Sequence, residues 1–386
     1  MRQLWGNLAA AGALYSLVVP VSLENLRRLA AARSLFEPTT LKRALEKMAF
    51  VQADPIRAPA RAQDLILRHR VKGYRAGDLE RSFVTLGLEE DFFLTYGFIT
   101  KSLQSLMHPR SDCGVPADSP EPWPAERQRR AGLLLEFVRE RGAVHPREVD
   151  AHFSHGSVRN YWGGSSSATT HLLDEMHYRG LLRVARRESG IRIYSVRRHE
   201  PGPVDGAGRR ARMDALVDAA VGIYAPLPGR SLSYYVRRLR FAVPQWQAEL
   251  KSALERAKER LSHTRVGGVD WYWPGGEDPA RSTPEDTVRF LTPFDPVVHD
   301  RHRFELLWGW VYRFEAYTPA PRRTRGYYAL PLLWRDRVIG WANLSVKNGD
   351  LQSEIGHVGP APRARAFRRE LGAELDRIRE FLGLKT

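Results

Sequence analysis

Apolar residues near the start of the chain recur at helical spacing. Ser22 is a residue type that caps helices, and Leu23, Leu26 and Leu29 after it fall on one face, so a helix is predicted to run to about Phe36. The same spacing predicts further helices at 38–48, 62–69 and 88–106. Residues 109–125 are rich in Pro, Ser and Gly without apolar periodicity, which indicates a linker.

The pattern is clearest between residues 127 and 198. Helices are predicted at 127–141, 145–153 and 165–178, and the alternating residues 181–198 then form two strands that turn at Glu188-Ser189-Gly190. Three helices followed by a basic two-stranded hairpin are typical of a winged helix. In that fold the third helix would enter the DNA major groove, and the hairpin arginines, Arg186 and Arg187 among them, would contact phosphates.

The second half of the chain changes from helices to short aromatic strands. A linker at 202–208 precedes predicted helices at 211–224, 231–240 and 244–261 and a strand at 266–273, which makes another winged helix plausible. Strands are then predicted at 288–291, 308–317, 326–333 and 338–346, as in a small barrel or sheet, before an amphipathic helix at 363–382. The expected fold is mainly α with β, in segments 20–110, 125–200, 208–275, 286–350 and 360–386.

The charge balance narrows the class of partner. The 386 residues include 60 Lys and Arg against 44 Asp and Glu, a formal charge of +16. Such an excess indicates an acidic partner, most often nucleic acid and sometimes an anionic membrane. The alternative is a generic basic protein from a high-GC genome, in which arginine codons are common. A hydrophobic content of 43% excludes a disordered chain.

Other features of the composition limit compartment and cofactors. The single cysteine, Cys113, excludes an intramolecular disulfide and a cysteine-rich zinc finger, and favours a reducing cytoplasm. The apolar start of the chain is interrupted by Gln3 and Asn7, so a signal peptide is not expected, and no later stretch is apolar for long enough to span a membrane. Histidine pairs at 152/155 and 299/302 lack the partners of a closed metal site, so no metal is expected.

The most informative stretch is Gln52-Ala53-Asp54, followed by Pro55. Proline forces the residue before it out of the helical region, and side chains alternate along an extended segment, so Gln52 and Asp54 share one face. An amide and a carboxylate side by side suit chemistry on a polyanionic substrate, since basic residues follow at once. Those predicted to contact DNA are Arg57, Arg61, Arg68 and Arg70. Taken alone, the same residues also fit a helix end followed by an Asp-Pro turn.

Two further motifs stand near the C-terminal strands. Pro293-Phe294-Asp295-Pro296 holds a second carboxylate, for which capping of backbone amides in a buried turn is favoured over catalysis. Residues 322–326 lie between two predicted strands, so Arg322, Arg323 and Arg325 are expected at a basic hairpin tip that contacts DNA.

These segments together resemble the AlkZ/YcaQ family of bacterial DNA glycosylases. The resemblance rests on the ordered set of Gln52-Ala53-Asp54 with its arginines, Tyr161-Trp162-Gly163-Gly164-Ser165-Ser166, and a third group of motifs. That third group is Leu291-Thr292-Pro293-Phe294-Asp295-Pro296, Arg301, Glu315-Ala316-Tyr317, Gly326-Tyr327-Tyr328 and Leu330-Pro331. Asp rather than Gln at position 54 is similar to the YcaQ branch.

The resemblance implies a fold and an activity. It implies three tandem winged-helix units and a C-terminal β-barrel that form a cradle for double-stranded DNA carrying alkylated bases. It also implies a monomer without metal or cofactor that excises alkylated purines such as N7-alkylguanine and, as in the YcaQ branch, unhooks interstrand crosslinks. Gln52 and Asp54 would be the catalytic residues.

The chemistry of that reaction assigns roles to the two residues. An N7-alkylated purine carries a positive charge and leaves readily, so the enzyme must stabilise an oxocarbenium-like sugar and direct water to its anomeric carbon. Ionised Asp54 would do both, as a carboxylate does in inverting glycoside hydrolysis, while Gln52 would hold the water. No lysine follows the motif before Lys72, so Schiff-base chemistry is not expected. The alternative class is a non-enzymatic winged-helix DNA-binding protein such as a transcriptional regulator.

Overall fold

The computed structural model describes residues 20–110, 123–153, 157–159, 165–198, 205–283 and 285–385. The first part of the chain surrounds a three-stranded antiparallel sheet of order β1-β3-β2. Its elements are α1 Leu23–Ser34, α2 Leu41–Met48, β1 Phe50–Gln52, α3 Ala62–Leu67, α4 Asp78–Ser82, β2 Glu89–Phe92, β3 Tyr96–Ile99 and α5 Lys101–Met107. As predicted, Ser22 caps α1, and its side chain and that of Asn25 satisfy each other's backbone amides.

The helix predicted at 88–106 is wrong, because β2 and β3 occupy residues 89–99 and only α5 is helical. Gly97 shows why tertiary pairing overrides the local pattern. It lies opposite Gln52, and a side chain there would overlap the Val51 carbonyl oxygen and the Phe50 ring. The close approach of β3 to β1 therefore depends on a residue without Cβ.

The second part of the chain matches its predicted pattern of helices and hairpin. It contains α6 Ala125–Arg141, α7 Pro146–Phe153, β4 Ser157–Arg159, β5 Ser165–Ser167, α8 Ala168–Tyr178, β6 Leu182–Glu188 and β7 Ile191–Val196. Pro146 is the first residue of α7, where its missing N–H costs nothing. Ser189 and Gly190 turn the β6–β7 hairpin with positive φ. Residues of this part, among them Leu134, Val149, Leu173 and Val184, form a hydrophobic core of their own.

The third part packs against the first through a shared core. Its elements are α9 Gly206–Tyr224, β8 Leu227–Pro228, α10 Gly229–Arg238, the 3-10 helices η1 Leu239–Phe241 and η2 Pro244–Glu249, α11 Leu250–Arg260, β9 Ser262–Val266, β10 Val269–Trp273 and η3 Pro279–Arg281. The small sheet has the order β8-β10-β9. Leu26 and Phe50 of the first part belong to the same buried cluster as Leu216 and Trp271 of the third.

The C-terminal part is a half-barrel sheet, which fits the small barrel or sheet that the sequence predicts, whereas the resemblance implies a β-barrel. Its elements are β11 Val288–Phe290, α12 Arg301–Trp308, η4 Ala320–Arg322, β12 Leu330–Trp334, β13 Arg337–Lys347, β14 Asp350–His357 and α13 Arg365–Leu382. The strands follow the order β11-β12-β13-β14, and β11 and β14 remain edges in the described part of the chain.

The strand predicted at 308–317 is also wrong. Helix α12 runs to Trp308 and ends at Gly309, which has a φ of 76°. Beyond it, Trp310 and Tyr312 bury their rings and donate hydrogen bonds to carbonyl oxygens of the half-barrel segment, at 2.9 and 2.7 Å, without joining the sheet. Arg322 therefore ends η4, and residues 323–325 follow it in the connection to β12, not at a hairpin tip.

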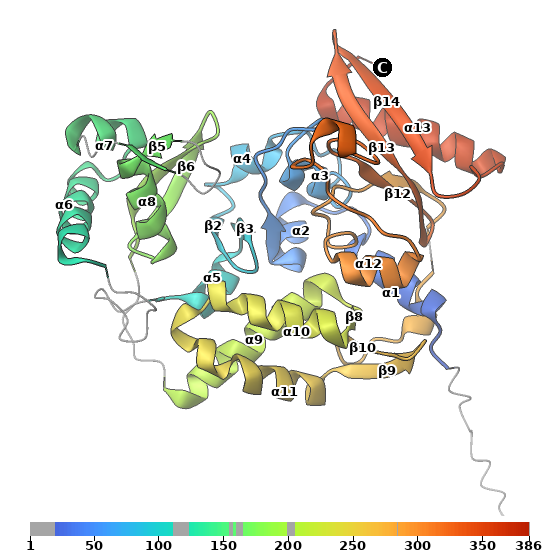
Figure 1. Ribbon diagram of the computed structural model, residues 1–386, viewed down its shortest axis with the longest axis horizontal. Helices are drawn as coiled ribbons and strands as arrows, with labels where there is room; N and C mark the ends of the chain where they lie inside the picture. The colour runs from blue at the N-terminus through green and yellow to red at the C-terminus, as the bar shows by residue number, and fades with distance from the viewer. Residues whose placement is uncertain are drawn as a thin grey trace, which may run out of the picture.

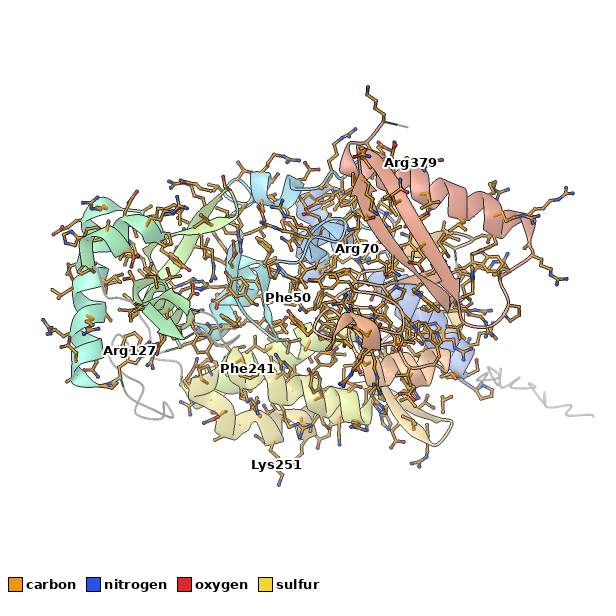
Figure 2. All side chains as sticks on the ribbon, turned by 45° about the horizontal axis from the view of Figure 1, so that its top comes forward. Phe50, Arg70, Arg127, Phe241, Lys251 and Arg379 are labelled. Atoms are coloured by element: carbon orange, nitrogen blue, oxygen red, sulfur yellow. The ribbon has the colours of Figure 1, made fainter. Side chains whose placement is uncertain are left out.

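Figure 1 shows how the parts are arranged: β1–β3 lie centrally, α9–α11 run along one side, α6–α8 with the β6–β7 hairpin lie at one end, and the half-barrel with α13 lies at the other. In Figure 2, Arg127 of the second part, Lys251 of the third and Arg379 of the C-terminal part lie toward the outside of the molecule, whereas Phe50 and Arg70 lie within it. No helix in the described ranges is both long and apolar enough to cross a membrane.

A buried ion pair joins the first part to the half-barrel. Arg70 and Asp295 are both fully buried, and two nitrogens of Arg70 bind the two carboxylate oxygens at 2.8 and 3.0 Å. Asp295 also accepts the Val297 amide at 3.0 Å, so the predicted capping turn is confirmed. The prediction that Arg70 contacts DNA is wrong in this structure, because its guanidinium is enclosed and occupied.

We predict that Asp295→Ala lowers the free energy of unfolding by about 3–5 kcal/mol, because it leaves a buried guanidinium unpaired. Chemical denaturation measures the change. The control is Asp286→Ala, which removes a half-exposed ion pair with Arg335 and should barely move the midpoint. Equal effects of the two substitutions would contradict the assignment of Arg70–Asp295 as a structural lock.

Candidate active site

The Gln52-Ala53-Asp54 segment leaves the central sheet in an extended conformation. β1 ends at Gln52, and the Ala53 amide still donates to the Tyr96 carbonyl oxygen at 3.1 Å. Asp54 turns back on the next residues, since its Oδ1 accepts the Ile56 amide at 2.9 Å. The sheet thus fixes Gln52, and the Asp-Pro turn fixes Asp54 beside it.

The electrostatics of these two side chains are unusual. Burial raises the pKa of Asp54, and the Ile56 N–H offsets the shift only in part. No cation within the described ranges forms an ion pair with this carboxylate. The Oε1 atom of Gln52 is buried and has no hydrogen-bond partner. Buried acceptors without partners are rare in folded proteins, so this pair is poised to receive a donor such as a water molecule.

An aromatic loop, residues 309–329, lies near Asp54. Phe314 is the hub of this group: its ring centroid is 5.2 Å from that of Phe294, 5.4 Å from Tyr328 and 6.0 Å from Tyr317. Burial first, and the Asp54 charge after it, raise the pKa of Tyr317. Tyr317 is nevertheless 65% exposed. Tyr317 therefore lies at the solvent-exposed edge of the site.

Glu315 holds the aromatic loop closed. Its carboxylate accepts the backbone amides of Thr324, Arg325 and Gly326 at 3.0, 2.7 and 3.3 Å. Burial would raise the pKa of Glu315, but these three bonds together outweigh it and lower the pKa. The motifs Glu315-Ala316-Tyr317 and Gly326-Tyr327-Tyr328 therefore meet in space. Both motifs can be identified in the sequence, but their spacing does not predict that the Glu315 carboxylate accepts hydrogen bonds from the backbone of the other motif.

The predicted DNA-contacting arginines separate into two groups. Arg57, Arg186 and Arg322 are exposed, although Arg186 also pairs with Glu188 at 2.6 Å. Others are engaged within the protein: the paired residues are Arg61 with Glu80, Arg68 with Glu374 and Arg187 with Glu90. In the loop, Arg323 lies over Tyr327, and Arg325 lies between Trp310 and Trp341. Sequence spacing finds the arginines but not the partners that compete with DNA for them.

The β6–β7 hairpin reaches the segment that follows Gln52-Ala53-Asp54. A side chain at Gly190 would meet the Arg61 guanidinium, so the hairpin turn lies directly against the residue that precedes α3.

The motif at 161–164, Cys113 and His155 lie outside the described residues. His299 is half-buried: its Nδ1 lies 2.9 Å from the Tyr235 hydroxyl oxygen, and desolvation lowers its pKa to about 3. Nowhere in the described ranges do three or more His, Cys, Asp or Glu side chains gather as metal ligands.

Comparison with known proteins decides the class. A model of the AlkZ-like DNA glycosylase family matches residues 45–381. The chain belongs to this family. It is therefore a DNA repair glycosylase, an enzyme that hydrolyses N-glycosidic bonds in DNA, and the regulator alternative is set aside. The solved structure of Streptomyces sahachiroi DNA glycosylase AlkZ shares the fold, with a TM-score of 0.61 and 14% identity over 95% of this chain and 98% of that chain.

We predict that Gly97→Ala damages both stability and activity of this glycosylase. The new methyl group would displace β1 and with it Gln52, which costs about 1–3 kcal/mol of stability and slows base release by up to about 100-fold. Denaturation and single-turnover base release measure the two effects. Gly132→Ala is the matched control: nothing lies within 4 Å of its Cβ and it sits in helix α6, so it should keep full activity. Loss of activity in that control would contradict the argument.

Proposed function

We propose that the protein excises alkylated purines such as N7-alkylguanine from double-stranded DNA and leaves an abasic site. The observation that carries the proposal is the pairing of a half-buried carboxylate, Asp54, with an unpartnered buried amide oxygen of Gln52. Interstrand crosslinks are included among the substrates, because Asp54 at this position is similar to the YcaQ branch and because Tyr317, near Asp54, is exposed to solvent.

The reaction requires little from the enzyme at the leaving group. The alkylated base carries a positive charge, and departure of the neutral base leaves that charge on the sugar. The Asp54 carboxylate stabilises the oxocarbenium-like sugar and accepts a proton from the attacking water, whose oxygen bonds to the anomeric carbon. The amide oxygen of Gln52 holds that water by accepting its second hydrogen, and it adds no charge to the site.

The environment of Asp54 strengthens this electrostatic role. A charge interacts more strongly with a cation where water is partly excluded. A half-buried carboxylate that forms no ion pair in the described ranges is therefore matched to a cationic transition state. The raised pKa is the cost of holding that charge in place. No lysine lies between Lys47 and Lys72 in the sequence, which supports a monofunctional hydrolase over a Schiff-base lyase.

The architecture supports a cradle built from three winged-helix units. Residues 205–273 form a helix, a short strand, two α-helices with two 3-10 helices between them, and two strands, and the sheet order is β8-β10-β9. Residues 125–198 form helices that are followed by the β6–β7 hairpin. With the first segment, 20–110, they would form three tandem units on a monomer. Arg57, Arg186 and Arg322 are the proposed phosphate contacts, since their side chains are exposed.

Asp54→Asn should reduce base release by at least about 100-fold while DNA affinity changes little. The assay is alkali-dependent strand cleavage of a duplex with one N7-alkylguanine. Because the folded-state pKa of Asp54 is raised, its ionisation costs stability above that pKa, so the variant should be as stable as the wild type or more so. Gln52→Ala should slow release without changing the salt dependence of binding. Full activity in both variants would exclude this segment as the active site.

The raised pKa of Asp54 also sets the pH dependence. The carboxylate must be ionised to act, so single-turnover base release should fall as the pH drops through its pKa, at a higher pH than for an ordinary aspartate. The profile is recorded after subtraction of spontaneous depurination. The residual activity of Asp54→Asn should lack this transition, and an unchanged transition in that variant would assign it to another group.

A further inference from the structure

A cavity lies near the end of the central sheet that is opposite to Gln52. It has a volume of about 610 Å³ and is bordered by α5, the end of β7 and the start of α9. The strand register places it: Gln52 pairs with Gly97, whereas the cavity lining begins at Glu89, which pairs with Ile99, and continues to Lys101 at the start of α5. Two residues of strand rise, roughly 7 Å, separate Gly97 from Ile99, and neither Gln52 nor Asp54 is among the lining residues. This cavity is therefore distinct from the catalytic segment.

The wall of this cavity is strongly basic. The cations that line it are Lys101, Arg183, Arg197, Arg198 and Arg212, and the acidic residue among them is Glu89. His108 also lines it, but burial lowers its pKa to about 3, so it adds no charge near neutral pH. Lys101, Arg198 and Arg212 form no ion pair within the described ranges, and Arg212 instead donates to the His108 carbonyl oxygen at 2.9 Å. The excess of positive charge along this wall favours the binding of an anion in the cavity.

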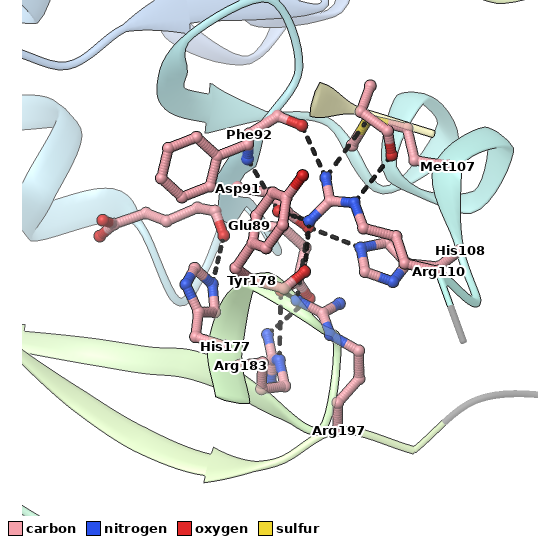
Figure 3. A network of polar contacts seen from close by, with 12 residues as sticks. Glu89, Asp91, Phe92, Met107, His108, Arg110, His177, Tyr178, Arg183 and Arg197 are labelled. Atoms are coloured by element: carbon pink, nitrogen blue, oxygen red, sulfur yellow. Dashed lines mark hydrogen bonds and ion pairs between the residues drawn. The ribbon is translucent and has the colours of Figure 1, made fainter. Parts of the chain in front are cut away.

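Arg197 is the buried member of this group. Only 4% of its side chain is exposed, and its Nε and Nη2 atoms make no hydrogen bond. Nη2 lies 3.5 Å from the Glu89 carboxylate and 3.8 Å from that of Asp91, close enough for attraction but not for well-formed hydrogen bonds. Figure 3 shows Arg183 and Arg197 side by side beneath this carboxylate pair. Arg197 therefore holds a buried positive charge at the wall of the cavity, and its two ion-pair partners leave part of its hydrogen-bonding capacity unused.

We propose that this cavity binds phosphate groups. Guanidinium groups present paired donors that match the oxygens of a phosphate, and a lysine adds a mobile positive charge. The cations come from three parts of the chain, Lys101 from the first, Arg198 from the second and Arg212 from the third. One phosphate ligand would therefore hold the three parts in a fixed relation. The phosphate belongs either to the backbone of the DNA substrate, away from the lesion, or to a free phosphorylated molecule.

The test uses the full-length double variant Lys101→Gln/Arg198→Gln. Both side chains are exposed, so the fold should be unaffected, and circular dichroism checks this. The matched control is Lys251→Gln/Arg363→Gln, which removes one exposed lysine and one exposed arginine on α11 and before α13. Affinity for an undamaged duplex is measured by fluorescence anisotropy across salt concentrations. Binding of inorganic pyrophosphate to the same three proteins, wild type, double variant and control, is measured by calorimetry in one buffer.

If the ligand is the DNA backbone, the slope of log affinity against log salt should fall in magnitude by about 1.8, since each phosphate contact contributes about 0.9. If the ligand is a free phosphorylated molecule, the DNA slope stays as in the wild type, and pyrophosphate binding weakens at least about tenfold, the loss of one charge-assisted contact. The control should change neither. Unchanged DNA slope together with unchanged or absent pyrophosphate binding would overturn the proposal.

These readouts are separate from catalysis. Base release at saturating DNA should stay unchanged in the double variant, because neither side chain borders Gln52 or Asp54. If the wild-type protein releases no alkylated base, the proposed function fails, while the binding measurements still decide whether this cavity takes phosphate.

Discussion

The buried carboxylate of Asp91 is the contact on which the arrangement of the chain depends. It accepts hydrogen bonds from Arg110 at 2.6 Å and His108 at 2.7 Å, and all three side chains are almost completely enclosed. Burial by itself would raise the pKa of Asp91, but Arg110 and then His108 hold it well below its usual range. The charge is therefore present at any pH at which the enzyme works, and it is lost only under strong acid.

Arg110 carries this anchor to three parts of the molecule (Figure 3). Besides Asp91, its guanidinium donates to carbonyl oxygens of Phe92 in the central sheet, Tyr178 at the end of α8 and Ala242 after η1. The third part also shares a hydrophobic core with the first. The second part has its own core, and it docks on the first through ionic contacts such as Arg187 with Glu90 and Arg183 with Glu89. The first and third parts thus share a hydrophobic core, whereas the second part is joined to the first by ion pairs and hydrogen bonds.

Much of the local structure could be predicted because local chemistry determines it. Pro55 fixes the extended segment at Gln52 and Asp54, Pro146 starts α7, and the turn at Ser189-Gly190 closes a hairpin. The failures share a cause. Residues 89–99 form strands because of pairing with β1, and 309–317 stay irregular because Trp310 and Tyr312 are satisfied by distant carbonyls. Arg70 looks like its neighbours in the sequence, and only the fold brings Asp295 to it. Long-range partners cannot be read from spacing.

The grip of Glu315 on residues 324–326 has an evolutionary consequence. It closes the intervening segment into a ring whose ends are fixed by the protein backbone, so the segment between them can lengthen or shorten without altering the half-barrel behind it. Tyr317 lies on that ring, close to Asp54 but on a different scaffold. Substitutions and changes of length in this segment can therefore accumulate while the half-barrel and the segment of Gln52 and Asp54 keep their structure.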